Sequence, residues 1–379
     1  MKSNWERLPF VDVIADESGG NIKTLQSEFL PNGRFAVVDQ GKELISGYLD
    51  NEPCLCKSLL PVIVFGDHTR CLKFIDFPFC MGADGVKILR PKVDADVKYL
   101  YYYLRQLNLP NAGYDRHFKY LKRSDILLPP SEEQKRIAQI LDLTQSLISK
   151  RKEAIAKLDT LIQSIFLEMF GDPVKNLKQW KRLPFSELLE NIDSGWSPVC
   201  LDRPVSGEEW GVLKLGAVTW CEYNPSENKA IPIDIKPKPE LEVKAGDILF
   251  TRKNTYELVA ACVLVRETPP RLMMPDLIFR FRLRSDSDID SCFLHQLLIY
   301  PTKRINIQKL AGGSSGSMPN ISKAKLQTIS IEIPPLPLQK EFTQRVEAVE
   351  KLKATHRASL SQLEALFASL QHRAFRGEL

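Results

Sequence analysis

The chain has 379 residues, of which 44% are hydrophobic and 26% are charged, with 52 basic and 47 acidic side chains and a net charge of +5. These values are typical of a folded globular protein, and they exclude collagen-like and wholly disordered chains. The small positive excess permits nucleic-acid binding without requiring it, and the length is sufficient for two to three domains.

Neither a membrane span nor a secretion signal is predicted. The sequence has no run of about 18 apolar residues, and its first ten residues, MKSNWERLPF, contain no apolar segment of a signal peptide. We therefore expect a cytoplasmic protein with no membrane partner. In that compartment the eight cysteines should be reduced thiols, although Cys54 and Cys56 leave a zinc site as the alternative.

Residues 1–130 are predicted to form a mixed α+β domain. Residues 61–65 and 85–89 have the apolar, β-branched composition of strands, and residues 99–107 are expected to form a short helix.

A long helix is predicted over residues 131–172. It follows Pro129-Pro130, and the sequence Ser-Glu-Glu-Gln at 131–134 fits a capping box, in which the first and fourth side chains bond to backbone N–H groups. The helix should end near Gly-Asp-Pro at 171–173, because glycine can terminate a helix and proline cannot continue it.

A second α+β domain is predicted over residues 173–335 and a second long helix over residues 336–379. The second domain has strand composition at 247–252, 258–267 and 277–283, and a short helix is expected at 293–300. The alternation in the last strand places Arg280, Arg282 and Arg284 on one face.

Three short segments of the first half recur in the same order in the second half. They are residues 5–10 with 180–185, residues 96–100 with 290–294, and residues 129–135 with 334–340, at offsets of 175, 194 and 205 residues. We infer an internal duplication in which loop insertions in the second copy increase the offset stepwise.

Both long helices carry apolar residues at the 4,3,4,3 spacing of a coiled-coil seam. The seam residues are Ile137, Leu141, Ile155, Leu158, Ile162 and Ile165 in the first helix and Phe342, Val346, Leu360, Leu363, Phe367 and Leu370 in the second. At 1.5 Å per residue each helix would be about 57 Å long, and a seam of that length needs a partner. We predict an antiparallel coiled coil with a pseudo-twofold axis; the alternative is that each helix packs on its own domain.

The seam is interrupted at one pair of equivalent positions, Arg151 and His356. Equivalent residues near a pseudo-twofold axis face each other, so these two side chains could form a polar layer that sets the register. In the alternative, both side chains point outward to water.

Motifs of common catalytic sites are absent. The chain has no Walker A loop, no dinucleotide-binding fingerprint, and no HExxH or GxSxG sequence. It also lacks the Asp/Asn-Pro-Pro-aromatic motif that an amino-methyltransferase would need. We therefore expect a protein that is not an enzyme, with no catalytic residue, cofactor or metal in this chain.

Polar loops at corresponding places in the two copies are the candidate recognition elements. Arginine, lysine and asparagine can pair with base edges, and hydroxyl and backbone N–H groups can hold phosphates. The candidates are His68, Thr69, Arg70, Arg116 and His117 in the first domain and Arg252, Lys253, Asn254, Ser314, Ser315 and Asn320 in the second. The alternative is that these are ordinary surface loops.

With these residues in view, the chain resembles the specificity subunit of Type I restriction-modification systems over essentially its whole length. The resemblance rests on the order domain, helix, domain, helix. It also rests on the segments at 5–10 and 180–185, on the Pro-Pro-x-x-x-Gln-Lys helix starts, and on Phe-Arg-Gly-Glu-Leu at 375–379.

The resemblance implies a division of labour. Each domain would be a target-recognition domain that reads one half of a bipartite, asymmetric double-stranded DNA sequence, and the helices would act as a spacer. The helices would also dock two modification (methyltransferase) subunits, and restriction (motor) subunits would join them. S-adenosylmethionine, ATP and Mg²⁺ would belong to those partner subunits.

Three other interpretations stay open. The chain could serve a methylation-only or other phage-defence system, or it could be a coiled-coil scaffold that joins two ligand-binding domains without binding DNA. It could also be an enzyme with an unrecognised nucleophile such as Cys71.

Overall fold

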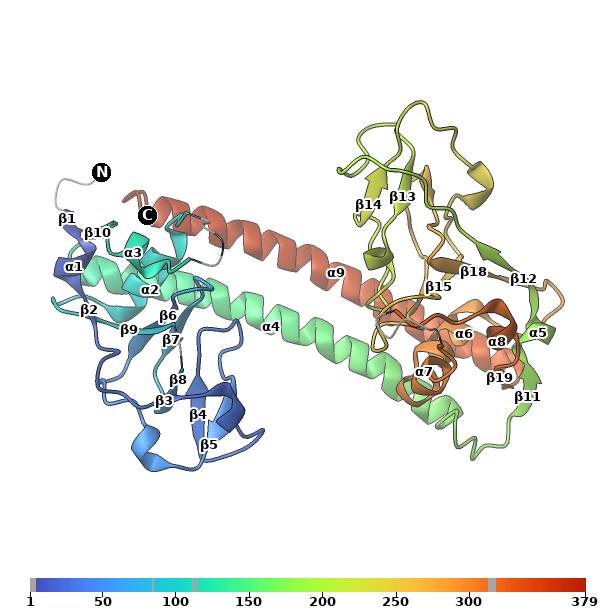
Figure 1. Cartoon of the computed structure of the whole chain (residues 1–379), viewed down its shortest axis with the longest axis horizontal. Helices are drawn as coiled ribbons and strands as arrows, with labels where there is room; N and C mark the ends of the chain where they lie inside the picture. The colour runs from blue at the N-terminus through green and yellow to red at the C-terminus, as the bar shows by residue number, and fades with distance from the viewer. Residues whose placement is uncertain (1–4, 84, 111–112, 114, 313–317) are drawn as a thin grey trace. The chain divides into compact units, whose positions relative to one another are not determined.

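A computed structural model describes residues 5–83, 85–110, 113, 115–312 and 318–379. The chain divides into two units, Met1–Glu153 with His356–Leu379, and Ala154–Thr355. Each unit contains one mixed domain and a part of both long helices, and the two units are called unit 1 and unit 2 below (Figure 1).

Unit 1 contains two four-stranded sheets. The first has the order β2 (Ile14–Asp16), β9 (Val86–Pro91), β6 (Val62–Gly66), β7 (Leu72–Ile75), and all its pairs are antiparallel. The second has the order β3 (Lys23–Thr24), β8 (Phe79–Gly82), β4 (Phe35–Val38), β5 (Gly47–Leu49), with the central β8–β4 pair parallel.

The central strand β6 is buried on both faces. Ile63 and Phe65 pack toward helix α2 (Val97–Gln106) and the long helices, whereas Val62 and Val64 pack toward the second sheet. This follows from the period of two in a strand, and it explains why the strand is apolar at every position rather than at alternate ones.

Unit 2 repeats this order of strands. Its first sheet is β12 (Leu189–Ser194), β18 (Ile278–Leu283), β15 (Ile248–Thr251), β16 (Cys262–Leu264), and its second is β14 (Asn228–Ala230), β13 (Gly211–Leu213), β17 (Leu272–Met273). Helices α6 (Ser291–Ile299), α7 (Pro301–Gln308) and α8 (Lys323–Gln327) follow. The predicted mixed α and β composition of both domains is confirmed.

Some predicted bounds are wrong. Strand β16 covers three residues of the predicted 258–267, because residues 255–259 form a turn whose carbonyls at Glu257 and Val259 accept bonds from Gln308 of α7. Helices α2 and α6 begin two residues earlier than expected, because Asp96 and Asp290 accept hydrogen bonds from the N–H groups of their first turns.

A two-stranded ribbon brings together the start and the end of each domain. In unit 1, β1 (Glu6–Pro9) pairs antiparallel with β10 (Asp125–Leu128), and in unit 2, β11 (Lys181–Pro184) pairs antiparallel with β19 (Ser330–Ile333). Phe10 and Phe185 follow the first strand of each ribbon and are buried, at 2% and 0% exposed. The repeated segments at 5–10 and 180–185 therefore have the same structural role in both units: each supplies one strand of the ribbon and a buried phenylalanine.

The long helices are α4 (Ser131–Phe170) and α9 (Leu336–Ala374). In unit 1 the beginning of α4 and the end of α9 share a core, which includes Ile137, Leu141, Phe367 and Leu370. In unit 2 the end of α4 and the beginning of α9 share a second core. The two helices therefore pack together in opposite directions. All the predicted seam residues are buried or half-buried.

The two polar seam residues face each other. Arg151 Nη1 lies 2.6 Å from His356 Nδ1, so the outward-pointing alternative is wrong. An arginine can only donate, so His356 Nδ1 accepts and its proton sits on Nε2. Two further ion pairs join the helices, Lys152 with Glu364 at 2.9 Å in unit 1 and Lys353 with Asp159 at 2.6 Å in unit 2.

A buried glutamine ties the start of each long helix to its domain. Gln134 accepts from Asp96 N (2.9 Å) and donates to Pro129 O (2.8 Å). Gln339 accepts from Asp290 N (2.8 Å) and donates to Pro334 O (2.8 Å) and Asp288 O (3.0 Å). We call each arrangement a glutamine clamp.

The predicted capping box is therefore wrong. The Gln134 amide is committed to the domain, and the first turn of α4 is closed instead by Pro130 O, which accepts from Glu133 N and Gln134 N. In both repeats, the glutamine of the Pro-Pro-x-x-x-Gln motif thus connects the long helix to its domain.

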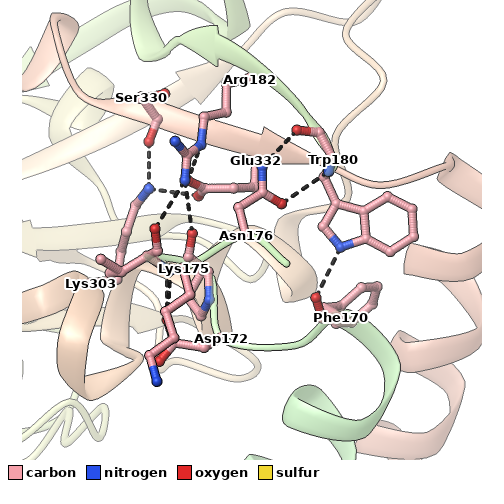
Figure 2. Close-up of polar contacts among 11 residues, drawn as sticks. Phe170, Asp172, Lys175, Asn176, Trp180, Arg182, Lys303, Ser330 and Glu332 are labelled. Carbon is pink, nitrogen blue, oxygen red and sulfur yellow. Dashed lines mark hydrogen bonds and ion pairs between the residues drawn. The ribbon is translucent and has the colours of Figure 1, made fainter. Parts of the chain in front are cut away.

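Side chains also bond to the backbone at the end of α4 (Figure 2). The Trp180 indole N–H donates to Phe170 O (2.9 Å), and Lys178 Nζ donates to Met169 O (2.8 Å). Gly171 then takes φ +75°, as expected for a residue that ends a helix. Further along, Arg182 of the ribbon donates to Pro173 O (3.4 Å) and Val174 O (3.1 Å), so the connecting segment is anchored to the ribbon. Glu332 accepts from both Arg182 and Lys303.

Replacing Gln339 with alanine should destabilise the protein. The change removes the partner of the half-buried Asp290 N–H, of the buried Pro334 carbonyl and of the Asp288 carbonyl, at an expected cost of about 1–3 kcal/mol in the free energy of unfolding. The matched control is Gln344→Ala, an exposed position on the same helix, with an expected change within about 0.5 kcal/mol. Urea denaturation measures both, and equal midpoints would show that the clamp contributes nothing.

Candidate nucleic-acid interface

Asp67 joins three segments in unit 1, directly after β6. Its N–H donates to Gly85 O (2.6 Å), its carbonyl accepts from His117 N (2.8 Å), and its buried carboxylate accepts from Phe118 N (2.8 Å). Because of these bonds the turn at 67–71 lies beside the start of α3 (Phe118–Leu121). The structure therefore brings together the two candidate loops of the first domain.

The loop at 39–46, between β4 and β5, is a third member of this group. The Thr69 hydroxyl donates to Gln40 O, and His68 N donates to Gln40 Oε1 (3.3 Å). Gly66 is required by this approach, since a Cβ there would lie 2.7 Å from Gln40 O. At Gly85, φ is +73° and a Cβ would lie 2.6 Å from Gln40 Oε1.

A charged pair holds the loop at 39–46 in place. Lys73 Nζ is buried and donates to Asp39 O (2.8 Å), and it lies 3.4 Å from Asp39 Oδ1. Burial disfavours the ionised Asp39 carboxylate, but hydrogen bonds from Ser46 and from Gly41 N, together with Lys73, outweigh it and lower the pKa of Asp39. The loop is thus anchored by an ionised carboxylate at neutral pH.

Arg252 has the place in unit 2 that Asp67 has in unit 1. Its N–H donates to Leu277 O (3.0 Å), directly before β18, and its carbonyl accepts from Ile321 N (2.8 Å). Lys253 pairs with Asn320 in an isolated antiparallel bridge. The structure therefore also brings the candidates of the second domain together, except Ser314 and Ser315, which lie outside the described residues.

A third loop joins this group as well. The Asn254 amide donates to Thr219 Oγ1 (3.3 Å), in the loop at 214–227 between β13 and β14. The two units therefore agree in one further contact. The residue two positions after Asp67 or Arg252, which is Thr69 or Asn254, bonds to the loop that follows β4 or β13. We call residues 39–46, 67–71, 113 and 115–118 loop cluster 1, and residues 214–227, 252–256 and 318–321 loop cluster 2.

Two candidates are placed to support loops rather than to contact a ligand. His117 is 1% exposed and its Nδ1 lies 3.1 Å from Asp67 O. Asn254 is 6% exposed, and its amide oxygen accepts from Thr255 N (2.8 Å). Both side chains are buried in this structure, and their assignment as DNA contacts stays a prediction.

The other candidates are accessible to different extents. Thr69, Arg70 and Arg116 are exposed, whereas His68, Arg252, Lys253 and Asn320 are half-buried. The Arg252 guanidinium lies 5.3 Å from the centre of the Phe279 ring, and its Nε has no hydrogen-bond partner in the part of the chain that the structure describes.

Three lysines next to the clusters did not emerge from the sequence. Lys87 and Lys122 lie 5.0 and 4.8 Å from the Phe118 ring, and Lys323 lies 5.6 Å from the Phe279 ring. They come from β9, from the end of α3 and from α8. No local motif marks them, since only the fold places Lys87 and Lys122 beside Phe118 and Lys323 beside Phe279.

A pocket of about 620 Å³ lies along β12 and β18 and is lined in part by Asp193, Arg280, Arg282 and Lys323. Arg280 is 2% exposed and its ion pairs are with Asp193 (2.9 Å) and Asp247 (3.1 Å). Of the three arginines predicted on one face, Arg280 therefore belongs to an internal ion-pair network. Its charge is already paired with two carboxylates and is not available to a ligand.

The described residues offer no metal site. They contain no group of three or more His, Cys, Asp or Glu side chains arranged to hold a metal, and all eight cysteines are free thiols. No helix in the ranges that the structure describes has both the length and the apolarity needed to cross a bilayer.

The sequence matches a protein family over most of its length. The family is described as "Type I restriction modification DNA specificity domain", and it matches residues 16–157 and 216–365. The chain belongs to this family. Each matched range contains most or all of one loop cluster and much of one long helix.

Named relatives agree. The chain is 36% identical over 169 residues to the EcoEI specificity subunit of Escherichia coli, covering 44% of this chain and 28% of that protein. It is 24% identical over 277 residues to the EcoKI specificity subunit of the same species, covering 67% and 58%. The chain thus spans about a quarter to somewhat over half the length of these two relatives.

A solved structure shares the fold. A Type I restriction-modification S subunit from M. genitalium superposes with a TM-score of 0.57 at 15% identity, covering 98% of this specificity-family chain and 96% of that one. At that identity the likeness concerns the fold alone. It agrees with the paired sheets and paired long helices described above.

Removing the Asp67 carboxylate should loosen loop cluster 1. In Asp67→Ala the Phe118 N–H loses its acceptor, so we expect hydrogen exchange in the peptide covering 115–121 to accelerate about 10-fold or more. The control is Asp94→Ala, an exposed carboxylate in the same unit, which should leave that exchange unchanged. Unchanged protection in Asp67→Ala would mean that this carboxylate does not hold the loops together.

Proposed function

We propose that this chain is the DNA-reading subunit of a Type I restriction-modification complex. Each domain reads one half of a bipartite target, and the chain has no catalytic step of its own. The observation that carries the proposal is the loop cluster, which has the same backbone bonds in both units but different side chains. A common frame with different contact residues is what two unequal half-sites require, so the target is asymmetric.

The exposed side chains suit DNA. Arg70 and Arg116 in loop cluster 1 can donate two bonds to guanine O6 and N7, and the Thr69 hydroxyl can contact a phosphate. In loop cluster 2, Lys253, Asn320 and the nearby Lys323 can serve the same purposes. The positive charge of these groups would make binding fall steeply with salt concentration. Because the substrate is cellular DNA, the complex would act in the cytoplasm.

The long helices are proposed to be the spacer between half-sites. The domains proposed for this role are 1–130 and 173–335, and the spacer is an antiparallel coiled coil of 131–172 and 336–379 that arose by duplication. The Arg151–His356 contact between equivalent positions supports a pseudo-twofold axis and a defined register. The glutamine clamps support a stiff connection, without which a spacer cannot set a distance.

The same helices are proposed to dock two modification subunits. Leu147 and Leu352 are equivalent by the offset of 205 and are 44% and 46% exposed, and Leu161 and Leu366 are likewise equivalent at 44% and 47%. Each unit therefore exposes one leucine from each helix at matching positions. Two copies of one apolar feature suit two copies of one partner. S-adenosylmethionine, ATP and Mg²⁺ would be bound by the modification and restriction subunits.

Sequencing of methylated adenines tests the reading of DNA. In cells that express this chain with its modification subunits, we expect one split motif with two unlike halves. Arg116→Ala should weaken or relax only the half read by the first domain, and Lys253→Ala only the other, by about 5- to 100-fold in methylation rate. Lys57→Ala, an exposed lysine outside loop cluster 1, is the control.

Two results would contradict this function. One is a contiguous motif, or a single substitution that changes both halves. The other is a purified complex that binds duplex DNA with no dependence on salt, which would favour a scaffold that does not bind DNA.

Native mass spectrometry tests the docking. In the assembled complex, Leu161→Gln combined with Leu352→Gln should remove one modification subunit and leave the other, because each buried leucine contributes about 1.5–3 kcal/mol. Leu177→Gln, at a side chain that is 79% exposed between α4 and β11, should retain both subunits. Two subunits on the double variant would refute this docking surface.

A further inference from the structure

Loop cluster 2 presents two aromatic side chains to solvent. Trp220 is 75% exposed and Tyr256 is 53% exposed. They lie in different loops that are joined nearby, since the amide of Asn254, two residues before Tyr256, donates to Oγ1 of Thr219, the residue before Trp220 (3.3 Å). In loop cluster 1 the corresponding third loop also exposes an apolar side chain, Leu44 at 50%.

The loop that carries Trp220 is held by its own hydrogen bonds. Thr219 Oγ1 donates to Leu215 O (2.8 Å), Cys221 N donates to Val218 O (3.1 Å), and Asn224 N donates to Ala217 O (3.0 Å). The indole is therefore displayed at a defined place on an anchored turn. A large ring in water on an anchored loop is typical of a binding surface.

The turn that carries Tyr256 is anchored by α7. Gln308 Nε2 donates to Glu257 O (3.0 Å) and Val259 O (3.1 Å), and Arg304 Nη2 donates to Glu257 O (3.3 Å). Both rings thus stand on supports that are in place before any ligand arrives, so binding would not have to order them.

The charges around the rings indicate which part of a duplex they meet. Glu257 is exposed and directly follows Tyr256, so this position repels phosphates. The cations of the cluster, Arg252 and Lys253, lie on the other side of Asn254 in the same segment. Phosphates therefore suit the cations, whereas the rings suit an uncharged, apolar group. The major groove offers one such group, the 5-methyl of thymine.

Resting on the proposed function, we infer that Trp220 is a specificity-determining residue of the second domain, and that its indole contacts a thymine methyl group in the half-site with Tyr256 beside it. The contact adds recognition of an A·T pair that no arginine or lysine of the cluster supplies. It contributes through apolar surface, so it leaves the salt dependence of binding unchanged.

The test is a scan of the target duplex with the complete complex. Once the methylated motif is known, each thymine of the second half-site is replaced in turn by deoxyuridine, which lacks the methyl group. Wild type should lose about 3- to 10-fold in affinity at one position. Trp220→Ala should bind the thymine duplex about 5- to 50-fold more weakly, with an unchanged salt slope, and should no longer respond to deoxyuridine at that position.

Control variants separate the outcomes. Trp220→Phe should retain part of the effect, and Ile233→Ala, at a fully exposed apolar side chain outside loop cluster 2, should behave as wild type. The inference is overturned if Trp220→Ala binds all duplexes as wild type does, if it remains sensitive to deoxyuridine, or if it loses a modification subunit instead of DNA affinity. If wild type itself does not distinguish target from random duplex, the proposed function fails, and not this residue's role within it.

Discussion

The buried glutamine at the start of each long helix is the contact on which the arrangement of each unit depends. An amide taken out of water must satisfy its oxygen and both hydrogens or lose free energy. Gln339 does so by binding three backbone groups of its own domain, and Gln134 binds two. These bonds tie each domain to the start of the helix that it packs on.

In each loop cluster, the backbone bonds that hold the loops together do not involve the exposed side chains that could contact a ligand. The backbone bonds of Asp67 and Arg252 are equivalent, and a backbone bond does not depend on the side chain. Side chains on the turn can therefore change without losing the frame, while buried supports such as His117 and Asn254 cannot. This separation gives a physical basis for the proposal that two domains of one fold read different half-sites.

Much of the fold could be predicted. The burial of Ile137, Leu141 and Phe342 and the end of α4 at Gly171 depend on local spacing and backbone preference, and the structure buries these three residues and ends α4 there. The residues that would contact DNA stay a prediction. His117 and Asn254 have the right chemistry for DNA but are buried, and the loops at 39–46 and 214–227 were missed because no motif recurs there.

The sequence by itself determined the repeat, the helical periodicity, the strand composition and the polar break at Arg151 and His356. Each of these is a property of residues near one another in the chain, or of two segments compared directly. Only the tertiary structure decided that Gln134 bonds to Asp96, that Asp67 joins three loops, and that Thr219 meets Asn254. These contacts link residues far apart in sequence, and a side chain's partner at that range depends on how whole sheets and helices pack.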